Sequence, residues 1–455
     1  LLNFGLPSRS EQMLFLVGTF VSVTVASGFL RIFLIKISAE LSALASADLV
    51  DDIFAKVVSQ RYSFHKRYNT SEVISLLSDK VSMVTGLLMS ICSLFNSAVM
   101  LVFILVSLIF QSPLLTLTGI LGFVCAYYAC LRITRVNIDQ NSKLVAILGP
   151  KYLRAIQEAL LSIREMILSN SQLFFSNAVS KISREMRMVH ANNIVMSQAP
   201  RYVVEMLLFV AIGSFAAIVV YKGGDLVDVA ALGVLAIGAQ RMLPLVQMAY
   251  SAYVNIRISK VSLVEVQRYL DLKPELRVKC EKDINDRQFN LLTIEDVYFR
   301  HEGASSDSLC AVNLKIKRGQ SYLITGESGA GKSTLVDIIS GLLAPSSGQL
   351  SIDGRVFSED TISSWQSGIS YVPQTIFLVD KSIAENVAFG IKPGDIDFNL
   401  LSSACDAAGL KKFLNSNDGG LNAMVGEAGE KISGGQRQRI GIARALYRQP
   451  KLLIL

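Results

Sequence analysis

Long apolar runs alternate with long polar stretches over the first 250 of the 455 residues. Five of the apolar runs reach, or nearly reach, the ~20 residues that a helix needs to cross a bilayer. They lie at about 13–35, 86–110, 113–131, 202–221 and 227–250. Because no soluble core needs runs of this length, the pattern predicts an all-α, polytopic membrane domain over residues 1–270.

The connections between the runs differ in length and charge. Two are tight turns with few charges, at 111–113 and 222–225, whereas 36–85 and 132–201 are long and basic. Basic connections stay on the cytoplasmic side, so we place both long connections inside and the N-terminus outside. Helical apolar spacing continues through them, and ~30 residues of helix reach ~45 Å below a span. We therefore expect long cytosolic helix extensions that turn near 62–69 and 170–175, with two separate soluble hairpins as the alternative.

Composition narrows the class of partner. Hydrophobic residues make up 51% of the chain, the formal net charge is +7, and the basic residues gather beside the apolar runs. This distribution is typical of cytoplasmic membrane flanks, so we expect membrane lipids and no nucleic acid as partners. The six cysteines show no C-x-x-C spacing, which argues against a disulfide framework or a zinc site.

The pattern changes after the last apolar run. Residues 271–289 are charged, contain Pro274 and are interpreted as a linker. From 290 onward, strands are expected at 291–299 and 309–316, followed by a short buried strand at 321–325. Residues 290–455 are therefore predicted to form an α/β domain.

The stretch from Gly326 to Ser333, GESGAGKS, fits G-x-x-x-x-G-K-[ST] and leads into a helix with apolar spacing at 333–343. In such a P-loop, backbone N–H groups and the helix start face phosphate, a role that suits these small residues. Lys332 would reach the β- and γ-phosphates and the Ser333 hydroxyl would bind Mg²⁺, whereas a chance glycine-rich turn is the alternative. The motif therefore predicts a nucleotide and Mg²⁺ as ligands, with contacts from Gly326, Ser328, Gly329, Ala330, Gly331, Lys332, Ser333 and Thr334.

Three further stretches follow the P-loop: 371–374 (YVPQ), 425–429 (VGEAG) and 432–436 (ISGGQ). They resemble the Q-loop, the acidic loop of the exporter branch and the signature of ATP-binding cassette (ABC) proteins. The resemblance covers the whole chain, because membrane spans fused ahead of one cassette resemble an exporter-type half-transporter. It implies an ATPase in which the cassette closes head to tail with a second copy of the chain or with a homologous half-transporter.

The resemblance also implies residue roles. Lys332 and Gln374 would be catalytic, with Gln374 joining Ser333 at Mg²⁺. His301 would stack on the adenine, with Tyr298 as the runner-up. The signature residues of the opposing copy would contact the same ATP in trans, although read alone they could be an ordinary turn: Ser433, Gly434, Gly435 and Gln436.

Two parts of the family pattern are expected outside this sequence. Such proteins have six spans, and the first is expected to precede residue 1. The Walker B aspartate, the water-positioning glutamate and the switch histidine are expected after Leu455. The chain as given is therefore expected not to hydrolyse ATP, and a naturally degenerate cassette is the alternative.

Within the exporters, residues 155–165 (AIQEALLSIRE), 200–202 (PRY) and 240–244 (QRMLP) resemble the bacterial lipid-linked oligosaccharide flippases. This resemblance implies a multi-pass protein of a bacterial inner membrane with its cassette in the cytoplasm. It further implies an amphipathic substrate, a lipid-linked saccharide or related lipid. A peptide or drug exporter, an ATP-regulated membrane sensor and a gated pore are the alternatives.

Glu205 and Arg241 are ionisable residues inside predicted spans, far from the outer ends, where such groups are costly. Glu205 and Arg241 each lie ~24 Å below the outer end of a span, so they could pair. Arg201, one turn from Glu205, is another possible partner. One interpretation is a structural ion pair. The other is that Arg241 faces a central cavity and binds the phosphate of an anionic lipid headgroup, a bidentate task that suits arginine.

Overall fold

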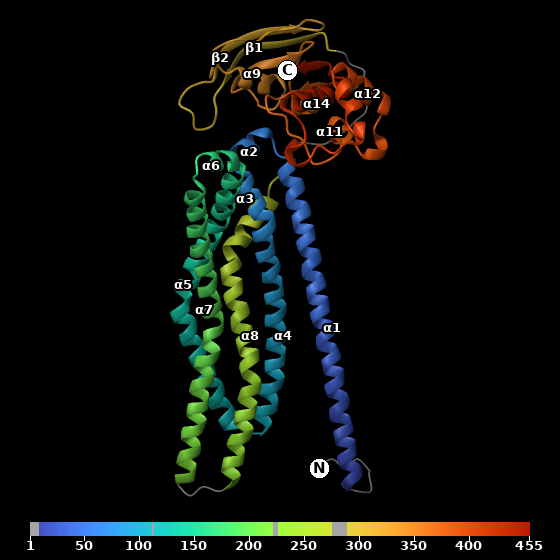
Figure 1. Cartoon of the computed structure of the whole chain (residues 1–455). Coiled ribbons are helices and arrows are strands. Elements are labelled where there is room, and N and C mark those ends of the chain that lie inside the picture. The colour runs from blue at the N-terminus through green and yellow to red at the C-terminus, as the bar shows by residue number, and fades with distance from the viewer. Residues whose placement is uncertain (1–8, 112, 222–225, 275–288) are drawn as a thin grey trace. The chain divides into compact units, whose positions relative to one another are not determined.

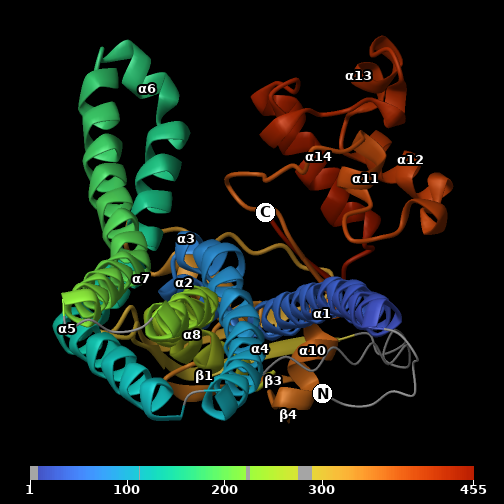
Figure 2. The same ribbon diagram turned by 90° about the horizontal axis from the view of Figure 1, so that it is seen from below.

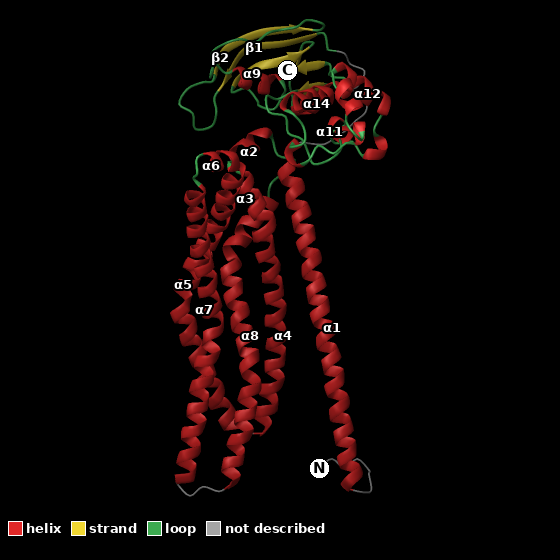
Figure 3. Cartoon of the chain, in the orientation of Figure 1, coloured by secondary structure: helices red, strands yellow, loops and turns green. Residues whose placement is uncertain are grey.

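The computed structural model describes residues 9–111, 113–221, 226–274 and 289–455. The predicted turn at 222–225, residue 112 of the other turn and most of the predicted linker lie outside the described residues. Contacts divide the chain into two compact units: residues up to Val58 with Arg67–Pro274, and Ser59–Lys66 with the chain from Glu275 onward. Helices build the first unit, and the described strands all lie in the second (Figure 3).

Five long helices dominate the first unit. They are α1 (Arg9–Val58), α4 (Val81–Gln111), α5 (Pro113–Leu161), α7 (Gln172–Tyr221) and α8 (Leu226–Leu270). A helix of 50 residues, such as α1, is ~75 Å long, more than twice the ~30 Å thickness of the hydrocarbon layer. The expectation of spans that continue as long helices is therefore confirmed.

Among the described residues, α1, α5, α7 and the run from Thr70 to Val106, which includes most of α4, are long and apolar enough to cross a membrane. The fifth expected span, 227–250, falls in α8, but most side chains at its start lie outside the described set. The helices α4, α5, α7 and α8 lie side by side (Figures 1 and 2). Long helices packed side by side in this way form a helix bundle.

Short elements occupy the predicted cytosolic turns. They are α2 (Tyr62–Arg67), α3 (Thr70–Ser75), the π-helical turn η1 (Leu76–Lys80) and α6 (Ile163–Leu168). The chain reverses between α6 and α7 at Asn170, whose φ of 53° is left-handed. Both predicted turn regions are thus confirmed, and α5 continues through Pro150.

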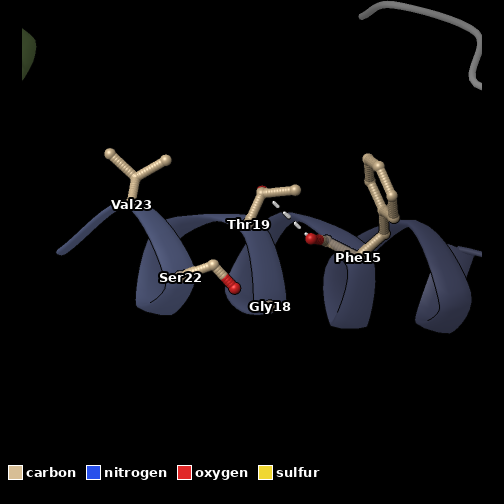
Figure 4. A pocket seen from close by; sticks show the side chains of 5 residues that line it. All are labelled: Phe15, Gly18, Thr19, Ser22 and Val23. Carbon is tan, nitrogen blue, oxygen red and sulfur yellow. Dashed lines mark hydrogen bonds between the residues drawn. The ribbon is translucent and has the colours of Figure 1, made fainter. Parts of the chain in front are cut away.

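Buried side chains of the first unit gather away from the apolar start of α1. Tyr127, Ile138, Val204, Leu243 and Tyr250 belong to one core cluster. By contrast, the described side chains from Ser10 to Leu41 of α1 are exposed or half-buried. One shallow hollow there lies between Phe15 and Val23, over the small residues Gly18 and Ser22 (Figure 4). Small residues four positions apart allow close helix–helix approach in a membrane, so this surface suits packing against lipid or another helix.

The second unit begins with an antiparallel sheet of order β2-β1-β3-β4. Its strands are β1 (Leu291–Phe299), β2 (Leu309–Lys317), β3 (Ser347–Ile352) and β4 (Arg355–Val356). The strands predicted at 291–299 and 309–316 are confirmed. The helices α9 (Lys332–Ile339) and α10 (Glu359–Ser367) accompany this sheet, and Trp365 of α10 donates a hydrogen bond to the Ile339 carbonyl at 2.7 Å. A parallel pair, β5 (Ile369–Tyr371) with β6 (Leu452–Ile454), completes the strands.

The rest of the second unit is helical and has its own core. It comprises α11 (Ile383–Val387), α12 (Phe398–Ala407), α13 (Lys411–Ser416) and α14 (Gly434–Tyr447), with short 3₁₀ turns at Pro393–Asp395, Gly420–Asn422 and Glu427–Gly429. Figure 2 shows these helices grouped apart from the sheet. Leu378, Ile383, Leu401 and Ile440 are fully or almost fully buried in this core. The cassette thus has two packed parts, and the predicted α/β fold is confirmed.

Candidate nucleotide-binding site

Glycines determine the backbone conformation of the P-loop. Gly329 and Gly331 have φ values of 86° and 84°, in the left-handed region that side chains disfavour. At Gly331 a Cβ atom would stand 2.4 Å from the Ser308 carbonyl oxygen and 2.8 Å from a methyl carbon of Leu309. The start of β2 therefore closes one side of the loop, and only glycine fits there.

The start of α9 offers hydrogen-bond donors to an anion. Gly331 is its N-cap and has no side chain that could accept from the helix, so the first backbone N–H groups are left for another acceptor. Unsatisfied N–H groups and the helix dipole make such a helix start a phosphate site. Ser333 is exposed at this end, whereas Thr334 is buried beneath it.

The Lys332 side chain folds back over the P-loop. Its ammonium donates hydrogen bonds to the carbonyl oxygens of Gly326 (2.8 Å) and Glu327 (2.6 Å). A phosphate in the loop would offer a stronger, charge-assisted partner than these neutral carbonyls. The lysine is thus held at the loop without being buried, as a phosphate ligand should be.

The prediction of a short buried strand before the P-loop is wrong. Residues 321–325 are exposed, Leu323 by 88%, and they join no ladder with a described strand. Tyr322 instead accepts a hydrogen bond from the Lys317 amide (2.8 Å) and donates one to Gln320 (2.6 Å). A strand needs a hydrogen-bonded neighbour. Here β5 pairs with β6, and the apolar segment before the loop is left without a ladder.

Gln374 follows β5 on an exposed bend, after the buried Val372. Three residues earlier, Tyr371 ends β5, and burial raises the pKa of its phenol, with the nearby Asp337 and Tyr62 adding to the effect. Asp337 lies on α9, and its carboxylate pairs with Lys66 of α2 at 3.6 Å. The helix that starts at the P-loop, the approach to Gln374 and α2 therefore meet at one cluster.

The signature forms the start of α14. Ser433 is the N-cap: its hydroxyl accepts from the Gln436 amide (3.3 Å), and the Gln436 side chain accepts from the Ser433 amide (2.9 Å). This reciprocal capping box fixes the helix start. Ser433, Gly434 and Gly435 stay exposed. Among the described residues, no hydrogen bond or ion pair joins them to the P-loop of the same chain, which leaves them available to a second molecule.

Two arginines of α14 hold this helix in place. Arg444 donates to the carbonyls of Asn386 (2.8 Å) and Phe377 (3.0 Å), and burial lowers the pKa of its guanidinium. Arg437 donates to the Gly429 carbonyl at 3.1 Å. Gly429 ends the predicted acidic loop, in which Glu427 is exposed. The acidic loop and the segment after Gln374 are thus both tied to the signature helix.

His301 lies just after β1 in a tight turn. Its ring meets the Phe299 ring edge to face at 4.9 Å, and its carbonyl accepts from the Ala304 amide. Tyr298, the alternative adenine partner, is 37% exposed. The described contacts show how His301 is oriented by Phe299, and its stacking on adenine stays a prediction.

Glu205 and Arg241, the two charged residues singled out in the predicted spans, do not pair with each other. Glu205 pairs with Arg201 on the same helix at 3.9 Å. Among the described residues, Arg241 has no ion-pair partner within 4.0 Å, and it is exposed between Gln240 and the buried Met242. The Glu205–Arg241 pair is therefore wrong in this structure, because the partner one helical turn away is closer. The headgroup role of Arg241 stays a prediction.

Sequence reasoning missed the contact of Lys66 with Asp337 and the role of Asn386. The Asn386 side chain is fully buried, accepts from the Val379 amide (3.0 Å) and donates to its carbonyl (2.9 Å). These contacts join positions that no local spacing connects. Asn386 directly follows Glu385 in the mixed stretch 382–390 (SIAENVAFG), so the sequence holds no local signal for its role.

Comparison with known proteins covers both units. The family model "ABC transporter" matches residues 309–455, and "ABC transporter transmembrane region" matches 1–223. A solved structure, "Structure of a bacterial Atm1-family ABC exporter with ATP bound", has a TM-score of 0.80 and 21% identity, covering 99% of this chain and 79% of that one. This likeness establishes a shared fold.

Curated relatives are similar over parts of the chain. The "ATP-dependent lipid A-core flippase" of Ralstonia nicotianae is 34% identical over 171 residues, 37% of this chain and 29% of that protein. The Salmonella typhimurium protein of the same name is 27% identical over 295 residues, 64% of this chain and 50% of that protein. The "ABC multidrug transporter atrD" of Emericella nidulans is 33% identical over 204 residues, 43% of this chain and 15% of that protein.

The chain thus spans half the length or less of these curated relatives. Both of its parts are nevertheless matched, the helical part by the transmembrane model and the cassette by the ABC transporter model. The order of the two parts and the exporter fold agree with the arrangement expected from the motifs. The chain belongs to the ABC transporters and has the exporter-type arrangement of one transmembrane region followed by one cassette.

Proposed function

We propose that this chain is half of an ATP-driven exporter that hydrolyses ATP to move an amphipathic substrate across a membrane. The observation that carries the proposal is the pairing, in one unit, of an uncapped P-loop helix start with an exposed, capped signature. Each is half of a phosphate site, and no described contact joins them within the chain. A second copy, or a homologous half-transporter, supplies the missing half.

The chain's own residues fit a nucleotide with Mg²⁺. The uncapped start of α9 would take the β-phosphate, with Lys332 moving from the loop carbonyls to the β- and γ-phosphates. Ser333 and Gln374 are exposed and would hold Mg²⁺, which supplies positive charge to the phosphates when bound. Ser433 and Gly435 of the opposing copy would donate to the γ-phosphate. Closure of the two copies then depends on ATP.

Coupling to the membrane helices would pass through α2. Residues 59–66 belong to the cassette unit although α1 precedes them, and Lys66 pairs with Asp337 on the P-loop helix. We expect Lys66→Ala to leave ATP hydrolysis within about twofold, because a half-exposed ion pair contributes little stability. The same change should lower transport per ATP. Equal losses of hydrolysis and transport would place Lys66 outside the coupling path.

The substrate is proposed from the relatives and from one residue. A relative named lipid A-core flippase matches 64% of the chain, and Arg241 is exposed at the predicted depth of the inner half of a span. A guanidinium binds a phosphate with two parallel hydrogen bonds. We propose a lipid with a phosphorylated saccharide headgroup, moved from the inner towards the outer leaflet of a bacterial inner membrane. The atrD likeness favours a drug exporter as the second candidate.

The test is ATP hydrolysis by the full-length protein in liposomes, with and without a phosphorylated lipid-linked saccharide. We expect stimulation by this lipid that Arg241→Ala reduces and Lys332→Ala abolishes. Stimulation by hydrophobic drugs alone would replace the lipid with the second candidate. An absence of Lys332-dependent hydrolysis under all conditions would overturn the exporter proposal and favour an ATP-regulated sensor.

A further inference from the structure

A cavity of about 450 Å³ lies in the first unit, among the cytosolic ends of α3, α5 and α8. Its lining comes from Tyr68 to Lys80, from Ala146 to Arg154 and from Glu265 to Tyr269. All of these residues lie in the helical unit, and none belongs to the P-loop, the signature or the vicinity of Arg241. Cavities of ~300–1,000 Å³ are the size that small-molecule sites use.

Two helix irregularities border this cavity. Leu76 and Lys80 belong to the π-helical turn η1, and Pro150 interrupts the hydrogen bonding of α5. Beside Pro150, a Cβ on Gly149 would meet the Ser75 hydroxyl at 3.6 Å, so the two irregular segments face each other closely. Each irregularity weakens a helix, and π-turns occur frequently at functional sites. Because both irregularities border the same opening, we interpret the cavity as part of the fold and not as a chance gap in packing.

Positive charge dominates the lining. Lys80, Lys151, Arg154 and Arg268 line the cavity together with only two carboxylates, Glu72 and Glu265. The lining therefore carries an excess of two positive charges. Lys80 pairs with Glu265, and Arg154 donates to Glu158 at 2.8 Å through one nitrogen only. Among the described residues no ion pair is recorded for Lys151 or Arg268, so two cations remain for an outside anion.

One wall is aromatic. The rings of Tyr68 and Tyr269 meet edge to face at 6.2 Å, and the Tyr68 hydroxyl accepts from Arg268 at 3.1 Å. Burial raises the pKa of Tyr269 to about 12, so its phenol stays neutral and adds no negative charge to the lining. A flat ring can lie on such a wall while its charged group reaches the arginines.

The position of the cavity along the helices favours a soluble ligand over a membrane lipid. On α5 and α8 its lining begins 15 residues beyond the inner ends of the predicted spans at 131 and 250, which corresponds to ~22 Å of helix. A phosphate of a lipid in the bilayer lies at the ends of the spans and does not reach this depth. The ligand must therefore come from the cytosolic solution.

We propose that this cavity binds a soluble phosphorylated small molecule with a planar ring, of nucleotide size, as a second ligand site outside the cassette. Arg154 and Arg268 hold the phosphate, Lys151 adds a third cation, and Tyr68 with Tyr269 contacts the ring. A ligand bound there joins three helices at their cytosolic ends, so its presence stiffens the region next to α2.

The test uses pyridoxal 5′-phosphate, a planar phosphorylated aldehyde that couples to a nearby lysine amine on reduction with borohydride. The full-length protein is labelled, and the modified lysines are mapped by mass spectrometry. We expect Lys151 to be labelled about tenfold faster than Lys181, an equally exposed lysine on α7, because charge-assisted contacts concentrate the probe. Inorganic pyrophosphate should suppress this difference.

The matched variant is Arg154→Ala/Arg268→Ala. It should bring Lys151 labelling down to the rate of Lys181, while labelling of Lys332 stays sensitive to ATP, which reports that the variant is folded. Equal labelling of Lys151 and Lys181 in the unaltered protein would overturn the proposal. Suppression by vesicles of phosphatidylglycerol, but not by pyrophosphate, would also overturn it, because the ligand would then be a lipid headgroup.

Discussion

The two units place their polar chemistry differently. In the cassette, the P-loop and the signature are exposed segments whose backbone is fixed by glycine conformations and by a capping box. In the helical unit, long stretches of α1 expose apolar side chains, and the polar residues are spread over positions far apart in sequence, such as Asn141 and Asn193. ATP binding is therefore a local property of short segments, whereas the proposed substrate binding would depend on how whole helices pack.

The largest effect should come from the P-loop lysine. Lys332→Ala removes the cation that the loop carbonyls hold in place. We expect ATP hydrolysis by the full-length protein to fall by at least ~100-fold, the scale of losing one preorganised charge-stabilising donor. Lys412→Ala, which removes an exposed lysine from α13, is the control and should leave hydrolysis unchanged. Similar losses in both variants would show a general charge effect.

Substitutions at two P-loop glycines distinguish the cost of left-handed backbone strain from the cost of a steric clash. Gly331→Ala should lower the free energy of unfolding of the cassette by about 3 kcal/mol, because left-handed strain adds to a clash with the Ser308 carbonyl. Gly329 has nearly the same φ, but nothing lies within 4 Å of its Cβ position. Gly329→Ala should therefore cost about 1 kcal/mol. Chemical denaturation measures both, and equal losses would remove the crowding argument.

In the helical unit, Asn141 and Asn193 test long-range packing. Both are buried, and the Asn141 amide donates to Asn193 at 2.8 Å. Asn141→Ala leaves a buried amide without its partner, at a cost of about 1–3 kcal/mol. Phe29→Ala on α1, where the ring is 71% exposed, should leave the thermal stability in detergent nearly unchanged. A larger loss at Phe29 would mean that α1 is packed in solution.

The smallest effect concerns pH. Hydrogen bonds from the Ser382 hydroxyl and amide, and then the neighbouring Lys381, lower the pKa of Glu385 at the start of α11 below its ordinary value of 4.5. A lowered pKa in the folded protein stabilises it above that ordinary value, and the gain is lost as the pH falls through the folded pKa. The wild type should exceed Glu385→Gln slightly in thermal stability at neutral pH. The two should converge below pH 4.5; a constant difference would exclude this titration.

Local segments of the fold could be predicted, and distant contacts could not. The strand at Leu291–Phe299 and the turn at Asn170 follow from short-range alternation and helix breaks. The expected strand at 321–325 failed because its apolar pattern says nothing about a ladder partner. Lys66 and Asp337 are 271 positions apart, and no periodicity connects them. The pairing of Glu205 with Arg201, by contrast, follows from their spacing of one helical turn, which the sequence does contain.

The most direct test of the central claim joins the two half-sites across a dimer. Ser328→Cys and Ser433→Cys are combined in the full-length protein after its native cysteines, of which Cys125 and Cys310 are exposed, have been replaced by serine. A short bis-maleimide is then added with and without ATP and Mg²⁺. Our account predicts a covalent dimer that forms with ATP, fails to form when Lys332→Ala is added, and is absent from either single cysteine variant. Cross-linking that is confined to one chain, or that is indifferent to ATP, would contradict closure of two copies around the nucleotide.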